Sequence, residues 1–272
     1  MNRLASLLSR PKIILRTPQF KSLCSSSNIK SSSLASASHL LTLATAKQLK
    51  GDIEEAVNLT NRALTKQREE NDPNEIADTA LFLGKLLQLQ NKFNEAETSF
   101  NESYSIHQSL SPNKRCQYVA QSHLAHAQKK LRRYQDSEKN YCEALRGLEK
   151  TIGWKDGFTN HTSFELARLY REQRQDREAS AALESMKGHL GDAFGKEDPR
   201  VLQINGELAE IKFSLGDKKA AMFLLDELVN KLPPNSPEAR RAFIRLEELK
   251  EQEGMEVKVG DVSVTLTKGT QK

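Results

Sequence analysis

The stretch LARLYREQRQDREASAALESM, residues 166–186, decides the fold, because it places two helical segments on either side of a short polar break. The first segment carries the pair Leu166 and Ala167, and the second carries another small residue, Ala179, twelve positions after Ala167. Two antiparallel helices joined by a short turn approach closely only where a side chain is missing, so a small residue is expected on each helix at the contact. This stretch therefore predicts a helical hairpin.

The same arrangement occurs five times along the chain. The small residue of the second segment recurs at intervals of 40, 41, 42 and 42 residues, at Ala56, Ala96, Ser137, Ala179 and Ala221. Twelve positions earlier, each has a small partner that follows a leucine, at Leu43 and Ala44, Leu83 and Gly84, Leu124 and Ala125, Leu166 and Ala167, and Leu208 and Ala209. A single hairpin cannot bury its apolar face, so we expect the five hairpins to stack.

Cap residues predict where the helices begin and end. Four pairs place an N-cap residue directly before a proline at the first helical position: Asp72 and Pro73, Ser111 and Pro112, Asp198 and Pro199, and Ser236 and Pro237. Gly51 and Gly216 fall in the breaks between paired segments, where a left-handed residue ends the first helix.

These features resemble the tetratricopeptide repeat (TPR) family over about residues 38–232. The spacing of 40–42 residues and the segments LARLYREQ (166–173) and FGKEDPRV (194–201) are similar in sequence to the kinesin-light-chain type of this repeat. The resemblance implies an all-α, right-handed superhelix of about five helix-turn-helix units that serves as a binding scaffold. The first and third units depart from the pattern, with polar side chains at positions where large packing residues are usual: Lys47, Thr60, Gln121 and Gln128.

Residues 37–254 are predicted to form the solenoid with a C-terminal capping helix. Residues 236–254 read as that helix, with an apolar stripe at Ala239, Phe243, Leu246 and Leu249 and an end at Gly254. Residues 255–272 are predicted to contain a small β-hairpin, because two alternating runs flank Gly260 and Asp261 and place all their apolar side chains on one face. We expect that face to dock on the solenoid or on a partner protein.

The N-terminal segment, residues 1–36, has the composition of an organelle transit peptide that is disordered and removed from the mature protein. It is rich in arginine and serine and free of acids, and Leu4, Leu7 and Leu8 share one helical face. The early arginines favour mitochondria, whereas the serine-rich stretch 22–38 leaves the chloroplast open. A basic tail with no targeting role is the alternative.

Net charge and hydropathy exclude several functional classes. Residues 1–50 hold eight of the 41 basic residues and no acid, so the rest of the chain has 33 basic against 36 acidic residues, a net charge of −3. The high pI thus comes from the N-terminus, and no nucleic-acid partner is expected for the repeats. No run of apolar residues is long enough for a transmembrane helix.

No motif points to catalysis, to a cofactor or to a bound metal. His123 and His126 lie three apart on a predicted helix, but the sequence suggests no third metal ligand. Cys116 and Cys142 lack a nucleophile motif and are better interpreted as buried, inert thiols. Trp154 lies in a predicted loop between repeats, where a wedge between hairpins is favoured over a ligand-stacking role.

In the TPR family the first helix of each pair lines the concave surface, and the resemblance places seven residues there: Lys85, Ser122, His126, Lys129, Phe164, Arg168 and Arg171. Their positive charge favours an acidic or phosphorylated peptide or a C-terminal carboxylate as partner. Glu165 and Glu172 are nearby, so an ordinary solvated helix face is the alternative. The Lys-and-Asn clamp of chaperone-binding TPR proteins is not reproduced, because Leu41 and Thr45 occupy its first-unit places.

The sequence therefore predicts a non-enzymatic organellar scaffold that binds a protein partner in its groove, and assembly or maturation of a larger complex is the role we expect for it. An organellar RNA-binding or RNA-processing factor is the alternative, since helical repeats can also read RNA bases. An enzyme with a metal site not evident from sequence is a third class.

Overall fold

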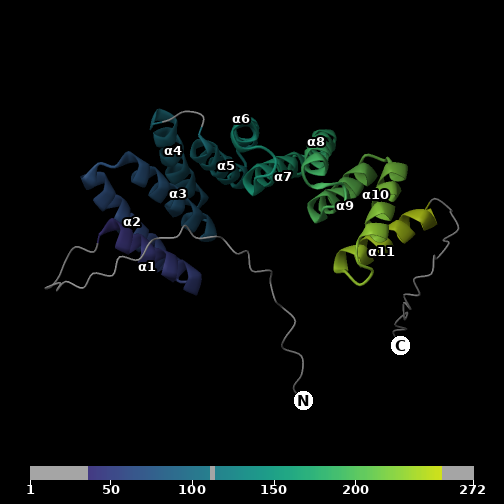
Figure 1. Ribbon diagram of the computed structural model, residues 1–272, viewed down its shortest axis with the longest axis horizontal. Coiled ribbons are helices and arrows are strands. Elements are labelled where there is room, and N and C mark those ends of the chain that lie inside the picture. Colours follow the sequence, from purple (N-terminus) through teal and green to yellow (C-terminus); the bar gives the residue numbers. More distant parts are fainter. Residues whose placement is uncertain (1–35, 111–113, 253–272) are drawn as a thin grey trace, which may run out of the picture. The chain divides into compact units, whose positions relative to one another are not determined.

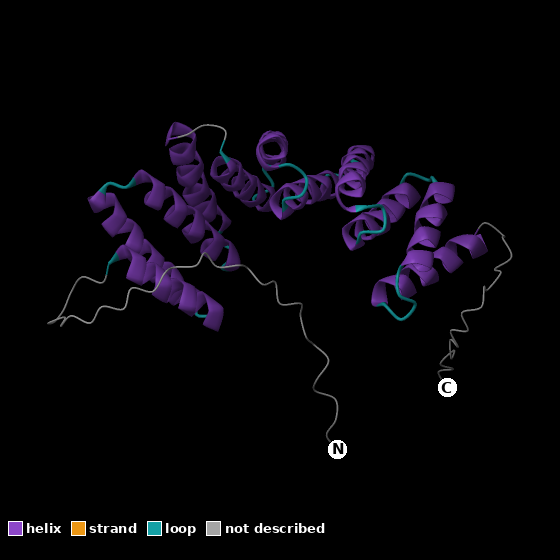
Figure 2. Ribbon diagram, in the orientation of Figure 1, coloured by secondary structure: helices purple, strands orange, loops and turns teal. Residues whose placement is uncertain are grey.

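The computed structural model describes residues 36–110 and 114–252, and within these residues every regular element is an α-helix (Figures 1 and 2). The elements in chain order are α1 (Ala37–Lys50), α2 (Ile53–Glu70), α3 (Pro73–Leu89), α4 (Phe93–Leu110), α5 (Arg115–Lys130), α6 (Tyr134–Ile152), α7 (Gly157–Glu172), α8 (Asp176–Phe194), α9 (Pro199–Ser214), α10 (Lys218–Lys231) and α11 (Pro237–Gln252). None of these helices is long and apolar enough to span a membrane. The predicted transit peptide and β-hairpin lie outside the described residues.

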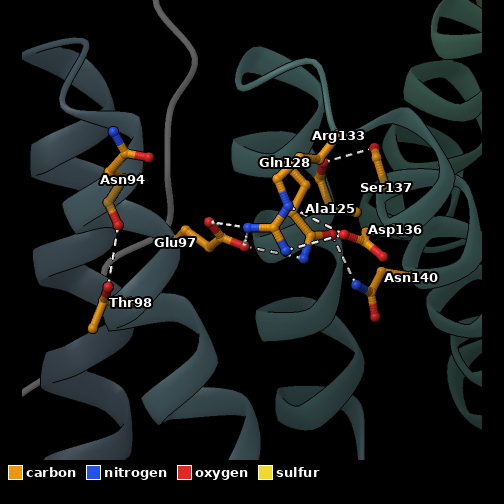
Figure 3. A network of polar contacts seen from close by, with 9 residues as sticks. All are labelled: Asn94, Glu97, Thr98, Ala125, Gln128, Arg133, Asp136, Ser137 and Asn140. Atoms are coloured by element: carbon orange, nitrogen blue, oxygen red, sulfur yellow. Dashed lines mark hydrogen bonds and ion pairs between the residues drawn. The ribbon is translucent and has the colours of Figure 1, made fainter.

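Five helical hairpins form where the small residues predict them, and each helix packs on the next along the chain. The pairs are α1 with α2, α3 with α4, α5 with α6, α7 with α8, and α9 with α10. All ten small residues at the predicted contacts are buried. In the third hairpin the Ser137 hydroxyl donates a hydrogen bond of 2.8 Å to the carbonyl oxygen of Ala125, so the two backbones are in close contact there (Figure 3).

The leucine that precedes the first small residue packs against the hairpin before it. Leu83 shares a cluster with Leu64 of α2, and the equivalent leucines of α5, α7 and α9 are also buried. Leu43 of α1 is the exception and is 40% exposed. The expectation that this leucine fills space between helices is wrong for the first unit, because no described helix precedes α1 to cover it.

The five intra-hairpin turns share one backbone conformation. In each, a residue with positive φ ends the first helix, and it is glycine at the two predicted positions, Gly51 (φ 88°) and Gly216 (φ 82°). In the other three hairpins Asn91, Arg132 and Arg174 adopt the same conformation, with φ of 59–60°. Every turn has the paired hydrogen bonds of a Schellman motif, in the first hairpin from Gly51 N–H to Gln48 O and from Asp52 N–H to Lys47 O.

Three of the four predicted N-caps are present. The Asp72 carboxylate accepts hydrogen bonds from the backbone N–H groups of Asn74 and Glu75, and Asp198 accepts one from Arg200 N–H. The Ser236 hydroxyl accepts one from Ala239 N–H. The fourth pair, residues 111–112, lies outside the described residues.

The polar departures in the first and third units are accommodated by local partners. Thr60 is fully buried, and its hydroxyl donates to the carbonyl of Ala56 at 2.7 Å. The Gln128 amide donates to Glu97 of α4 and accepts from Asn140 of α6, so it joins three helices (Figure 3). Buried polar groups are tolerated where they are hydrogen-bonded, so these residues keep the hairpin fold despite the lost apolar packing.

The capping helix α11 packs on α10 and ends the core of the last hairpins. Its buried residues are Ala239, Ala242, Leu246 and Leu249, whereas Phe243 is only half-buried. The predicted stripe is therefore rotated slightly, so that Ala242 takes the place expected for Phe243. The small side chain at 242 lets α11 approach its neighbour closely.

Candidate partner-binding face

The first helices α5, α7 and α9 are joined by polar contacts along one side, and α3 and α5 line a common hollow; we call this side the first-helix face. It is defined by Lys85 on α3, His126 on α5, Arg168 on α7 and Glu210 on α9. Helices α5 and α7 meet through an ion pair and a hydroxyl pair, α7 meets α9 through Arg171 and Glu207 at 2.5 Å, and α9 meets α11 through Glu210 and Arg245 at 3.7 Å. Several predicted binding residues thus lie on one connected face.

The centre of the first-helix face is a buried ion pair between α5 and α7. Lys129 and Glu165 are almost fully inaccessible, and the lysine Nζ lies 2.6 Å from Glu165 Oε2. His126 Nδ1 lies 3.3 Å from the same oxygen, and Arg168 Nη1 lies 3.1 Å from the other carboxylate oxygen. Burial raises the pKa of Glu165, but the hydrogen bonds from His126 and Lys129 outweigh it, so its pKa lies well below the usual range.

The other predicted residues of α5 and α7 divide into buried and accessible groups. Ser122 is buried, and its hydroxyl lies 3.0 Å from that of Thr162 on α7. Phe164 is half-buried against the core formed by α7 to α11. The side chains of Arg168 and Arg171 are 59% and 42% exposed, so they are accessible basic groups of this part of the face. Glu172 of α7 is also exposed, and its Oε1 lies 3.7 Å from Lys129 Nζ.

Lys85 lies in a different setting, at the edge of a hollow of about 430 Å³ that α1, α3 and α5 form together. His126 and Lys130 of α5 also line this hollow, together with Gln48 of α1 and Gln88 of α3. Burial lowers the pKa of Lys85, the nearby charge of Arg115 lowers it further, and Asp78 partly offsets both effects. Lys85 is half-buried, so the hollow holds a partly desolvated ammonium group.

A second hollow, of about 660 Å³, lies where α9, α10 and α11 meet. Leucines of α9 and α10 form its apolar wall, among them Leu202, Leu225 and Leu228. Its charged lining includes Glu207 and Arg241, which belong to ion pairs. This hollow therefore offers an apolar surface whose rim charges are already balanced.

The two histidines considered as a metal pair, His123 and His126, lie in different surroundings. The His123 ring is stacked on Phe100 at 5.3 Å and meets Phe158 edge-on at 5.5 Å, and its Nε2 is buried without a hydrogen-bond partner in the described structure. His126 instead faces the Glu165 carboxylate. The described residues contain no cluster of three or more His, Cys, Asp or Glu side chains suited to a metal ion.

The remaining candidates for chemistry have structural surroundings. Cys142 is half-buried, and burial raises the pKa of its thiol, which favours the protonated, unreactive form. Cys116 is exposed, so the expectation that it is buried is wrong: it lies in the first turn of α5, before the first buried residue of this helix, Gln117. Trp154 lies in the α6–α7 loop and stacks on His189 of α8, with ring centroids 4.4 Å apart.

Sequence reasoning noted that Glu165 lies near the basic residues, but it missed the ion pairs between first helices and the amides beside Lys85. The carboxylates that pair with Lys129 and Arg171 lie 36 residues further along, at Glu165 and Glu207. A residue 36 positions later lies on the first helix of the next hairpin, about one helical turn earlier in the repeat. Aligning the first helices by the repeat spacing would therefore have predicted these pairs. Gln48 and Gln88 come 40 residues apart and mark the same position in two successive repeats.

Comparison with known proteins supports the architecture. The sequence model of the tetratricopeptide repeat family matches residues 35–109, which span α1 to α4. We found no curated protein with matching sequence.

Several solved structures have a similar arrangement of helices. Kinesin-light-chain TPR-like repeats from Podosopora anserina match with a TM-score of 0.63 and 20% identity, covering 76% of this chain and 94% of that one. BtubC (BKLC) from P. vanneervenii matches with a TM-score of 0.61 and 18% identity, covering 86% and 87%. The apo form of RapI matches with a TM-score of 0.53 and 15% identity, covering 77% and 84%. At these identities the similarity concerns the fold.

Proposed function

We propose, from the premise that residues 37–252 have the fold of tetratricopeptide-repeat proteins, that this chain is a non-enzymatic scaffold that binds a protein partner along its first-helix face. The observation that carries the proposal is the arrangement of α5 and α7. There, the accessible guanidinium groups of Arg168 and Arg171 stand beside a fixed, buried ion pair between Lys129 and Glu165.

The buried pair supports binding because it holds the accessible groups in place before a partner arrives. Glu165 accepts contacts from α5 and also from Arg168 one turn along its own helix, so one guanidinium nitrogen of this arginine is held in place. A partner then loses less conformational entropy on binding than it would on a face of free side chains. Guanidinium groups also offer two parallel donors to a carboxylate, so an acidic partner suits this face.

A protein of this fold with a bound factor also supports the proposal. A Rap protein complexed with Competence and Sporulation Factor matches this chain with a TM-score of 0.55 and 10% identity, covering 80% of this chain and 65% of that one. The fold therefore accommodates a bound partner in at least one distant structural neighbour.

We further propose that the scaffold works in an organelle, in the mitochondrion rather than the chloroplast, where it holds its partner during assembly of a larger complex. The support is the composition of residues 1–36, which are basic, free of acids and amphipathic at the start. Organelle fractionation followed by mass spectrometry of the native protein tests this. A native chain that retains Met1 and fractionates outside organelles would contradict it.

Site-specific photo-crosslinking tests the binding function. A photoreactive amino acid at position 168 should capture a protein in the native setting, whereas the same amino acid at Arg177, exposed on α8, should not. Once the captured protein is identified, the charge reversals Arg168→Glu and Arg171→Glu should weaken its binding. The matched control reverses Lys139 and Arg177, which are exposed on second helices.

Each outcome of this experiment has a clear meaning. Equal capture from positions 168 and 177 would remove the first-helix face from the proposal. A crosslinked product that ribonuclease degrades and protease does not would instead favour the RNA-binding alternative. Circular dichroism of each variant confirms that lost binding does not come from lost helix, since Arg171 also pairs with Glu207.

A further inference from the structure

The hollow formed by α1, α3 and α5 has a lining that donates hydrogen bonds and offers no carboxylate. Its charged and titratable side chains are Lys85, His126 and Lys130, and its amides are Gln48, Gln88 and Asn91. Two apolar side chains, Leu89 and Phe93, complete it, and Leu89 is 59% exposed. No aspartate or glutamate lines the hollow, although the chain outside residues 1–50 has more acidic than basic residues.

At least one of these donors lacks a partner. The Nε2 atom of Gln88 is buried and makes no hydrogen bond within the described part of the chain. A buried donor without a hydrogen bond destabilises the folded state, so such a group points to a missing acceptor. Because Gln88 lines the hollow, an acceptor bound there can supply the missing bond.

The charge of Lys85 is compensated only in part, by the nearby Asp78. The pKa of Lys85 is lowered because burial penalises the ammonium group and because the Arg115 charge lies nearby. An anion placed in the hollow would stabilise the charged lysine and remove this penalty. Lys130 is exposed at the rim, where it can contact the same anion.

The basic residues of α5 and α7 differ from Lys85 in this respect. Lys129 and Arg168 both contact Glu165, and Arg171 contacts Glu207, so an incoming carboxylate must compete with internal ones there. An acidic group therefore gains more by entering the hollow than by contacting the exposed arginines.

We propose that this hollow is the anchoring site for a carboxylate of the partner protein, held by Lys85, Lys130 and Gln88. The exposed Leu89 and the adjacent Phe93 favour an apolar residue next to the acidic one in the bound segment. The inference rests on the proposed scaffold function and specifies where on the first-helix face the acidic group of the partner sits.

Nuclear magnetic resonance on the full chain tests the site directly, with the side-chain amide of Gln88 as reporter. The probes are the blocked peptide acetyl-Ala-Leu-Glu-Glu-amide, its neutral counterpart acetyl-Ala-Leu-Gln-Gln-amide, and inorganic phosphate. The acidic peptide should shift the Gln88 amide signal, and the neutral peptide should not. Because the basic N-terminal segment can attract any acidic peptide, binding is judged by this local signal.

Two paired-lysine variants provide the comparison. Replacing Lys85 and Lys130 with methionine removes the charges but keeps side chains of similar length. The affinity for the acidic peptide should fall about tenfold, as expected for lost charge-assisted hydrogen bonds. The same replacement at Lys139 and Lys150, which are exposed on α6, changes the net charge equally and should leave the affinity within about twofold.

Three results would overturn the assignment: an unshifted Gln88 signal, equal weakening by both lysine pairs, or a shift produced by phosphate and not by the acidic peptide. The last would assign the hollow to a phosphate group instead. If the assignment fails while photo-crosslinking from position 168 still captures a partner, the scaffold function stands and only this anchoring site is lost.

Discussion

Replacing Gly84 with alanine should destabilise the second hairpin, although alanine is the better helix former. Gly84 is the small residue of α3 that faces α4, and a Cβ atom built there would lie 2.5 Å from Cε1 and 2.6 Å from Cδ1 of Phe100. Phe100 is fully buried and stacks on His123, so its ring has little room to move. Relief of the clash requires a displacement of about 1 Å, because carbon atoms prefer separations near 3.5–4.0 Å.

Two opposing effects set the magnitude of this change. Overpacking a well-packed core costs about 1–3 kcal/mol. The gain in helix propensity from glycine to alanine is about 1 kcal/mol. The upper half of the overpacking range applies, since the contact is with a buried ring and not with the end of a flexible chain. We therefore expect the unfolding free energy of Gly84→Ala to fall by about 1–2 kcal/mol.

Gly188 provides the matched control on the same protein. It lies within α8, and a Cβ atom there meets no other atom within 4 Å, so Gly188→Ala should stabilise the protein by about 1 kcal/mol. Urea titrations followed by circular dichroism measure both changes. In a Phe100→Leu background, Gly84→Ala should cost less, because the smaller side chain leaves space for the methyl group. Equal stabilisation by both alanines would refute the close contact between α3 and α4.

Three further predictions concern the turns and the buried charges. Arg174→Gly should raise the unfolding free energy by about 0.5–1 kcal/mol in urea titrations, because Arg174 is held at φ 59°, where an L side chain is strained; no gain would contradict the assigned turn. Glu165→Gln should lower the unfolding free energy by about 3 kcal/mol, measured by thermal melting, because buried Lys129 keeps only the exposed Glu172 carboxylate, 3.7 Å away, as a counter-charge. Glu172→Gln, on an exposed carboxylate, should change stability by less than about 1 kcal/mol. Burial and the neighbouring positive charges hold the pKa of His123 at about 3, so the folded state binds fewer protons than the unfolded state below about pH 6.5. Stability should therefore fall as the pH drops from about 6.5 towards 3, by about 2–3 kcal/mol at pH 4.5, and His123→Phe should remove most of this loss; an unchanged pH profile in that variant would show that the histidine is not responsible.

The local pattern of the sequence was enough to predict the hairpins. Close approach of two helices requires small residues at the contact, and the ends of helices require capping residues. Both requirements act within one hairpin and select particular residue types at fixed spacing. Gly51 and Gly216 are an example, since both occupy the left-handed position that ends a first helix. Arg132 and Arg174 adopt the same conformation, but a residue type with no preference for it gives no local signal.

What only the tertiary structure decided is which side chains remain available to a partner. Lys129 and Arg168 looked alike in the sequence, yet one is buried against Glu165 and the other is exposed. Glycine and alanine also looked interchangeable at the small positions, but Phe100 leaves no room for a methyl group at Gly84. The reason is that burial and ion pairing depend on side chains contributed by neighbouring helices and by different hairpins. Their meeting is set by how the helices pack and not by any pattern within a single segment.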